Sequence, residues 1–93
     1  MKEIISALEQ LEKNIKNTQD TPKTDNAIQI IRKSILNRIK HSSGHEKSLL
    51  EQLDSELSIW QGKLNIILKE SAGRDGMAKH AKHWITSLRG GTQ

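Results

Sequence analysis

The chain has no cysteine, no phenylalanine and no tyrosine, and it contains a single proline among its 93 residues. The absence of cysteine excludes a disulfide framework, a thiolate nucleophile and every zinc site that depends on cysteine. The N-terminal segment 1–19 carries acidic residues throughout and lacks the long apolar run of a signal peptide or a membrane span. We therefore expect a cytoplasmic protein without a membrane span, and export by a route that needs no cleaved signal stays open.

The apolar residues that are present are almost all aliphatic. Twelve isoleucines and ten leucines stand against two aromatic residues, Trp60 and Trp84. A chain of 93 residues forms one domain at most, so we expect residues 1–93 to fold as a single helical domain. A domain this small is only marginally stable as a monomer, and self-association would stabilise it further.

The first half of the chain shows two segments with helical periodicity, in which apolar residues recur at steps of three and four. The segment 2–17 is the first predicted helix, with the inner residues Ile4, Leu8, Leu11 and Ile15. The polar segment 18–24 contains Pro22 and is predicted to end that helix. A second helix is predicted over 25–41, capped by Thr24 or Asp25. Its inner residues are Ile28, Ile31, Ile35 and Ile39.

The second half of the chain contains the most regular pattern. Ser43 stands three residues before Glu46, as in a capping box, and predicts the start of a helix over 44–71. A heptad seam runs along this helix and consists of Leu50, Leu53, Leu57, Trp60, Leu64 and Ile67. Gly62 is expected to allow a close helix crossing beside the ring of Trp60.

The last predicted helix covers 76–89. Gly73 is expected to terminate the preceding helix, and Asp75 is expected to cap this one. Its inner residues are predicted to be Met77, Ala81, Trp84 and Leu88.

These segments predict an all-α fold, a small antiparallel bundle of about four amphipathic helices with one long central helix. At 1.5 Å per residue the segment 44–71 is roughly 40 Å long, and the other helices are roughly 20 to 25 Å long. Either two short helices stack end to end along the long one, or a second protein chain covers the remainder. A second apolar row of Leu49, Ile59 and Ile66 favours contact on more than one side, although these residues could also widen the core face of a monomer.

Charge alternates along the chain. Segments 1–21 and 42–73 are net acidic, whereas segments 22–41 and 74–93 are net basic, and the whole chain carries a net charge of +4. Packing such helices side by side places unlike charges together, so part of the basic charge would be neutralised within the protein itself.

The leading functional hypothesis is a non-enzymatic protein-protein interaction module, such as a helical regulator, chaperone or immunity-type protein. It would act as a homodimer or through a partner helix that binds the third helix. The predicted interface residues are Leu53, Leu57, Ile59, Trp60, Leu64, Ile66 and Ile67.

No catalytic, cofactor or metal site is predicted. The chain has neither the sequence context of a nucleophilic serine nor a glycine-rich phosphate loop. His80 and His83 lie one turn apart, but no carboxylate or thiol stands at a fitting offset, and the neighbouring lysines would repel a cation.

The alternative hypothesis is a small basic regulator that binds nucleic acid. Basic residues of the second and fourth helices could contact phosphates, although no convincing helix-turn-helix spacing is present. The candidate contact residues are Arg32, Lys33, Arg38, Lys40, Lys79 and Lys82.

Overall fold

The computed structural model describes residues 1–91, and within that part of the chain it contains four α-helices and no β-strand. The helices are α1 (Lys2–Ile15), α2 (Thr21–Ile39), α3 (Gly44–Ile67) and α4 (Ser71–Gly91). The predicted all-α fold with four helices is therefore confirmed. None of the helices in 1–91 combines the length and the apolar character needed to cross a membrane.

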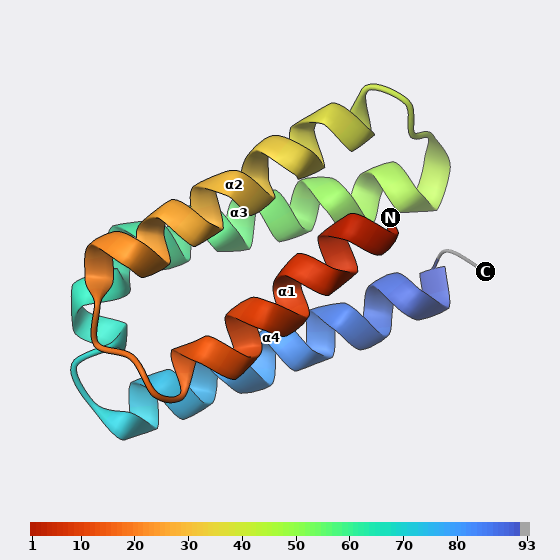
Figure 1. Ribbon diagram of the computed structural model, residues 1–93. Coiled ribbons are helices and arrows are strands. Elements are labelled where there is room, and N and C mark those ends of the chain that lie inside the picture. The colour runs from red at the N-terminus through yellow and green to blue at the C-terminus, as the bar shows by residue number, and fades with distance from the viewer. Residues whose placement is uncertain (92–93) are drawn as a thin grey trace.

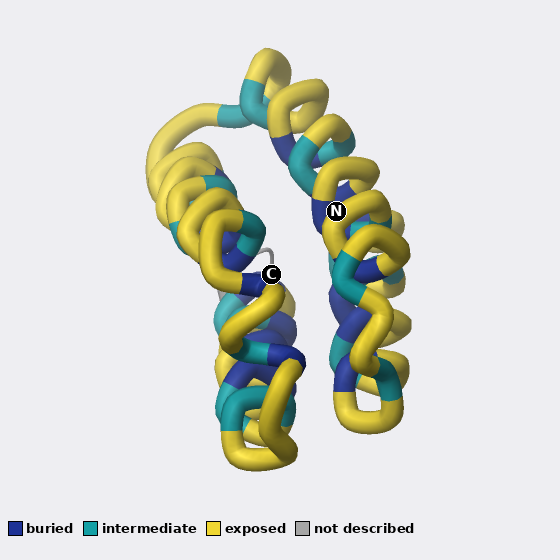
Figure 2. The backbone as a smooth tube through the Cα atoms, turned by 90° about the vertical axis from the view of Figure 1, so that its left-hand side faces the viewer, coloured by how far each residue is buried: buried dark blue, intermediate teal, exposed yellow. Residues whose placement is uncertain are grey.

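The four helices form a compact bundle of 37 × 20 × 18 Å. In Figure 1, α2 lies along α3 and α1 lies along α4, and these two pairs share the most extensive contacts. α1 also contacts α2, and α3 also contacts α4, whereas α1 with α3 and α2 with α4 are not in contact. Each helix therefore contacts two others, and the helices surround one shared core. Figure 2 shows their exposed faces turned outward.

The core consists of the aliphatic side chains that the helical periodicity placed inside. Ile39 and Trp84 are only half-buried, but the other predicted inner residues of α1, α2 and α4 are fully buried. Thr24 is the one buried polar residue among those described, and its hydroxyl donates a hydrogen bond to the carbonyl of Asp20 at 2.9 Å. The buried apolar residues are Ile4, Leu8, Leu11, Ile15, Ile28, Ile31, Ile35, Leu50, Leu53, Leu57, Trp60, Leu64, Leu68, Met77, Ala78, Ala81, Ile85 and Leu88.

The start of α2 differs from the expectation. The helix begins at Thr21 and its N-cap is Asp20, whose carboxylate accepts a hydrogen bond from the Lys23 backbone N–H at 3.0 Å. Neither Thr24 nor Asp25 caps it. Pro22 lies in the first turn, where the missing N–H would have no helical partner in any case and the fixed φ suits a helix. The proline therefore starts the second helix instead of separating two helices.

The junction between α3 and α4 also differs from the expectation. α3 ends at Ile67 rather than at 71, and α4 begins at Ser71 rather than at 76. The segment around Gly73 is helical, so Gly73 does not terminate α3 and Asp75 does not cap α4. Arg74 reaches back and donates a hydrogen bond from Nη1 to the carbonyl of Leu68 at 2.7 Å, which satisfies a carbonyl at the end of α3.

The revised bounds change the relative lengths of the helices. α3 has 24 residues, α4 has 21, α2 has 19 and α1 has 14. The expected excess of the third helix over its neighbours is therefore small.

The connection between α2 and α3 contains the predicted N-cap position, but the capping box is absent. Ser43 is the N-cap of α3, yet its side chain makes no capping hydrogen bond. Glu46 instead accepts a hydrogen bond from Arg38 Nε at 2.8 Å. Gly44 adopts φ +61°, a left-handed conformation that residues with a side chain rarely adopt. The turn between the two helices thus depends on this glycine.

Charge alternates between contacting helices, as expected. α1 holds two basic and three acidic residues, and α3 holds two and four. α2 and α4 each hold four basic residues and one acidic residue. Because α2 and α4 are not in contact, every contacting pair of helices joins a net basic helix to a net acidic one.

Candidate protein-interaction surface

Most of the predicted interface residues are occupied inside the chain. Leu53, Leu57, Trp60 and Leu64 are buried in the core, and Ile67 is half-buried against it. Their heptad seam binds the other helices of the same chain. The four buried residues are therefore not available to a partner while the bundle is intact, and Ile67 presents only part of its side chain.

The two remaining predicted residues lie on the opposite side of α3. Ile59 is 57% exposed and Ile66 is 70% exposed, whereas six of the twelve isoleucines are buried. They are seven residues apart, so they lie on one face of the helix, two turns from each other. Leu49, which the sequence grouped with them, instead packs half-buried at the edge of the core.

Uncharged residues continue this face along the length of α3. At alternating steps of four and three, six exposed residues form what we call the outer stripe of α3: Ser48, Gln52, Ser55, Ile59, Gly62 and Ile66. The stripe contains no charged side chain. Its spacing is that of a helix seam that packs against a second helix. The sequence analysis recognised only the isoleucines, although the same heptad spacing and the absence of charge identify the other four residues.

Two hydrogen bonds within α3 satisfy part of the polar groups of the outer stripe. The Ser55 hydroxyl donates a hydrogen bond to the Glu51 carbonyl at 3.2 Å, and Gln52 Nε2 donates one to Ser48 Oγ, also at 3.2 Å. Burying a polar group is costly when its hydrogen bonds are lost. A partner could therefore cover Ser55 without leaving its hydroxyl donor unpaired.

Gly62 has no role inside the bundle. A β-carbon at this position would meet no atom within 4 Å, so the expected close helix crossing beside Trp60 is wrong. Glycine in a helix interior costs about 0.5 to 1 kcal/mol relative to alanine. The fold thus carries an exposed glycine in the middle of α3 that no contact within the chain explains.

The two flanks of the outer stripe differ in charge. Glu56 lies on the flank facing α4, where its carboxylate is 3.5 Å from His80 Nδ1, and Lys63 lies two turns further along the same flank. The flank facing α2 carries Glu51, Ser58 and Asn65, which are all exposed, and only Glu51 is charged. One flank therefore presents an acidic and a basic side chain at a spacing of seven residues.

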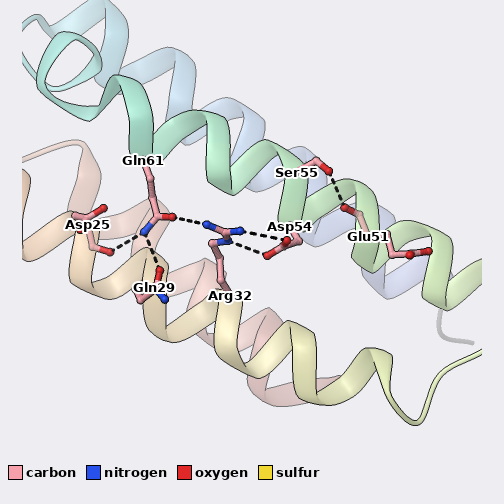
Figure 3. Close-up of polar contacts among 7 residues, drawn as sticks. All are labelled: Asp25, Gln29, Arg32, Glu51, Asp54, Ser55 and Gln61. Carbon is pink, nitrogen blue, oxygen red and sulfur yellow. Dashed lines mark hydrogen bonds and ion pairs between the residues drawn. The ribbon is translucent and has the colours of Figure 1, made fainter.

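A polar network fixes α3 against α2 beside this surface (Figure 3). Arg32 donates from Nε to Asp54 at 2.9 Å and from Nη1 to the side-chain oxygen of Gln61 at 2.8 Å. Gln61 in turn donates from Nε2 to Gln29 Oε1 at 3.2 Å. The hydrogen bond to Asp54 raises the pKa of Arg32 above its ordinary value, against a smaller opposing effect of burial. The guanidinium is thus committed to holding two helices together.

The candidate nucleic-acid contacts do not form one surface. Arg32 and Arg38 are paired with acidic residues of α3. Lys33 and Lys40 are exposed at α2, and Lys79 and Lys82 are exposed on α4. Because α2 and α4 are not in contact, the structure does not bring the two lysine pairs together.

The histidines and one groove are the other surface features that could form a site. The four histidines are exposed, and residues 1–91 contain no group of three or more histidine, aspartate or glutamate side chains placed to hold a metal. A groove of about 600 Å³ lies between α1 and α2, with Ala7, Leu11, Ala27 and Ile30 among its lining residues. The sequence analysis did not identify this groove, because neither helix alone shows which of its outer residues face the other.

Comparisons of the chain with protein-family models, with curated proteins and with solved structures give no match.

Proposed function

We propose that this chain is a non-enzymatic protein-protein interaction module that binds a second helix along the outer stripe of α3. The observation that carries the proposal is the pair Ile59 and Ile66, exposed by 57% and 70% on a face without charge. Burying an isoleucine fully is worth about 1.5 to 3 kcal/mol. Two such residues on a heptad seam supply a compact apolar anchor for a helical partner.

The proposal includes the antiparallel arrangement of the bundle, with α3 as the helix that presents the binding face. Short connections between helices that contact each other support it, because each connection leaves little chain for a crossover. A helical regulator, a chaperone or an immunity-type protein would use a surface of this kind.

The test compares exposed isoleucines inside and outside the outer stripe. Ile59 and Ile30 are each 57% exposed, but Ile30 lies on α2, outside the outer stripe. The double variant Ile59→Asp/Ile66→Asp should remain helical by circular dichroism and lose association. Association is measured as concentration-dependent mass in light scattering or as binding of a partner purified from the native cell. The variant Ile30→Asp should keep both its fold and its association.

Two results would contradict the proposal. Unfolding of Ile59→Asp/Ile66→Asp would mean that these side chains support the core. Unchanged association in that folded variant would place the interface elsewhere on the bundle.

The alternative function, nucleic-acid binding, now depends on the exposed lysines. The variant Lys33→Glu/Lys40→Glu should abolish binding to duplex DNA, and binding by the wild-type chain should weaken steeply between about 50 and 200 mM salt. Absence of binding by the wild-type chain at low salt in an electrophoretic mobility assay would eliminate this alternative.

A further inference from the structure

We infer that the helix that covers the outer stripe of α3 is α3 of a second copy of this chain, packed antiparallel about a two-fold axis between Ile59 and Gly62. The inference rests on the proposed function and specifies its partner. It starts from the two features of α3 that the fold leaves unexplained, which are the exposed isoleucines and the exposed glycine.

The outer stripe is sterically complementary to itself. In an antiparallel pair centred between positions 59 and 62, Ile59 of each copy lies over Gly62 of the other. Ile66 of each copy then lies over Ser55 of the other. A glycine leaves room for a large side chain, so each isoleucine fills the space that the missing β-carbon leaves. The glycine thereby acquires a role that no contact inside the chain gives it.

The charged residues beside the outer stripe are also complementary between two copies. In the same register, Lys63 of each copy lies within about one helical turn of Glu56 of the other, on the flank facing α4. The pair occurs twice because a two-fold interface repeats every contact. On the other flank, Ser58 lies beside Asn65 of the second copy, and both are uncharged. The antiparallel arrangement therefore joins unlike charges on one flank and neutral polar groups on the other, and Glu51 faces no residue of the second α3, because the position opposite it lies beyond Ile67.

A parallel arrangement of the two α3 helices is less favourable in the steric fit at Gly62 and in charge. Gly62 would face Gly62 and leave a gap at the centre of the contact. Glu51 of one copy would approach Glu56 of the other, because residues five apart in sequence face each other across a parallel helix pair. Like charges placed together oppose association.

The contact is small, since it involves one helix of each copy. Interfaces that bury less than about 1,200 Å² are usually weak or transient. We expect a dissociation constant on the order of 10 µM, so the dimer forms and separates with modest changes in concentration.

Charge reversal provides the decisive experiment. Glu56→Lys places Lys next to Lys63, and Lys63→Glu places Glu next to Glu56, so each variant alone should dissociate about tenfold more readily than the wild type. Mixed together, the two variants should form a heterodimer of wild-type affinity, because both reciprocal pairs are again of unlike charge. Sedimentation velocity on the full chain, at concentrations around the expected dissociation constant, measures the three samples beside the wild type.

Disulfide trapping tests the direction of the helices, and the absence of cysteine from the chain leaves only the introduced thiols to react. Ser55→Cys mixed with Ile66→Cys should give a cross-linked dimer. Ser55→Cys alone should not, since two Ser55 positions lie roughly 16 Å apart along an antiparallel pair and a disulfide needs Cα atoms within about 7 Å. Cross-linking of Ser55→Cys alone overturns the antiparallel register.

The remaining outcomes separate this inference from the proposed function. A mixture of the charge variants that stays as dissociated as each variant alone overturns the inference. So does a wild-type chain that is monomeric at millimolar concentration. If such a monomer still binds another protein in an Ile59-dependent manner, the proposed function stands and its partner is a different helix. If it binds no partner through Ile59, both fail.

Discussion

Two glycines of this chain differ in whether the fold requires them. A β-carbon on Gly73 would lie 2.3 Å from the backbone carbonyl oxygen of Ile67, whereas one on Gly76, a turn further along α4, would meet nothing within 4 Å. Gly73→Ala should therefore destabilise the protein by about 1 to 3 kcal/mol, because the two backbones must move apart. Gly76→Ala is the control and should stabilise by up to about 1 kcal/mol through helix propensity. Urea unfolding followed by circular dichroism measures both.

Equal stability of the two alanine variants would show that the turn between α3 and α4 can widen at little cost. In that case the close approach at Gly73 would not determine where α4 begins.

Replacing Gly62 by alanine should raise the stability of the separated chain and weaken its self-association. Gly62→Ala should stabilise the separated chain by about 0.5 to 1 kcal/mol, since nothing in the bundle resists the added methyl group. The same methyl group should weaken self-association, because it takes the space of Ile59 from the second copy. Thermal unfolding at low concentration gives the first effect, and sedimentation gives the second. Gly76→Ala, which adds the same group outside the outer stripe, should leave association unchanged; an equal loss in both variants would argue against the role given to Gly62.

At the scale of the helices, we expect the contact between α2 and α3 to depend more on Arg32 than on Arg38. The side chain of Arg32 is 25% exposed and bonds two residues of α3, whereas that of Arg38 is 44% exposed and bonds only Glu46. Arg32→Ala should cost about 1 to 2 kcal/mol of stability, because Asp54 loses its partner in a partly buried position. Arg38→Ala should cost less than about 1 kcal/mol, as surface ion pairs usually do. A double-mutant cycle of Arg32→Ala with Asp54→Asn measures the coupling free energy between Arg32 and Asp54. A coupling free energy near zero would mean that Arg32 stabilises the contact only by packing.

Periodicity predicted which face of each helix is buried, but not where each helix begins. The inner residues of α1 and the seam of α3 up to Leu64 followed directly from spacing, because burial selects apolar residues at helical intervals. The starts of α2 and α4 were wrong. A proline in a first turn and a glycine-rich first turn both resemble loops in sequence. The contacts at these two starts are hydrogen bonds of Asp20 with the Lys23 N–H and of Arg74 with the Leu68 carbonyl, which a pattern of apolar residues does not report.

The candidate site was predicted only in part, because a sequence pattern does not show which other helix a residue contacts. Ile59 and Ile66 were identified because apolar residues on an otherwise polar face stand out in sequence. The residues of the seam were included in the interface because a heptad pattern does not specify whether its partner helix belongs to the same chain. Arg32 and Arg38 were assigned to a possible nucleic-acid surface because their acidic partners lie on another helix.

At the scale of the whole molecule, the alternation of charge predicts the effect of salt on stability. Contacting helices lie about 10 Å apart and carry opposite net charge, whereas the like-charged helices α2 and α4 lie across the bundle, at roughly 1.4 times that distance. Attraction between neighbours therefore exceeds repulsion across the bundle, despite the net charge of +4. Raising NaCl from 10 to 300 mM shortens the screening length from about 30 to 6 Å and should lower the free energy of unfolding by a few tenths of a kcal/mol. Urea titrations at low micromolar protein measure this change, and a gain in stability with salt would mean that repulsion from the net positive charge dominates the bundle.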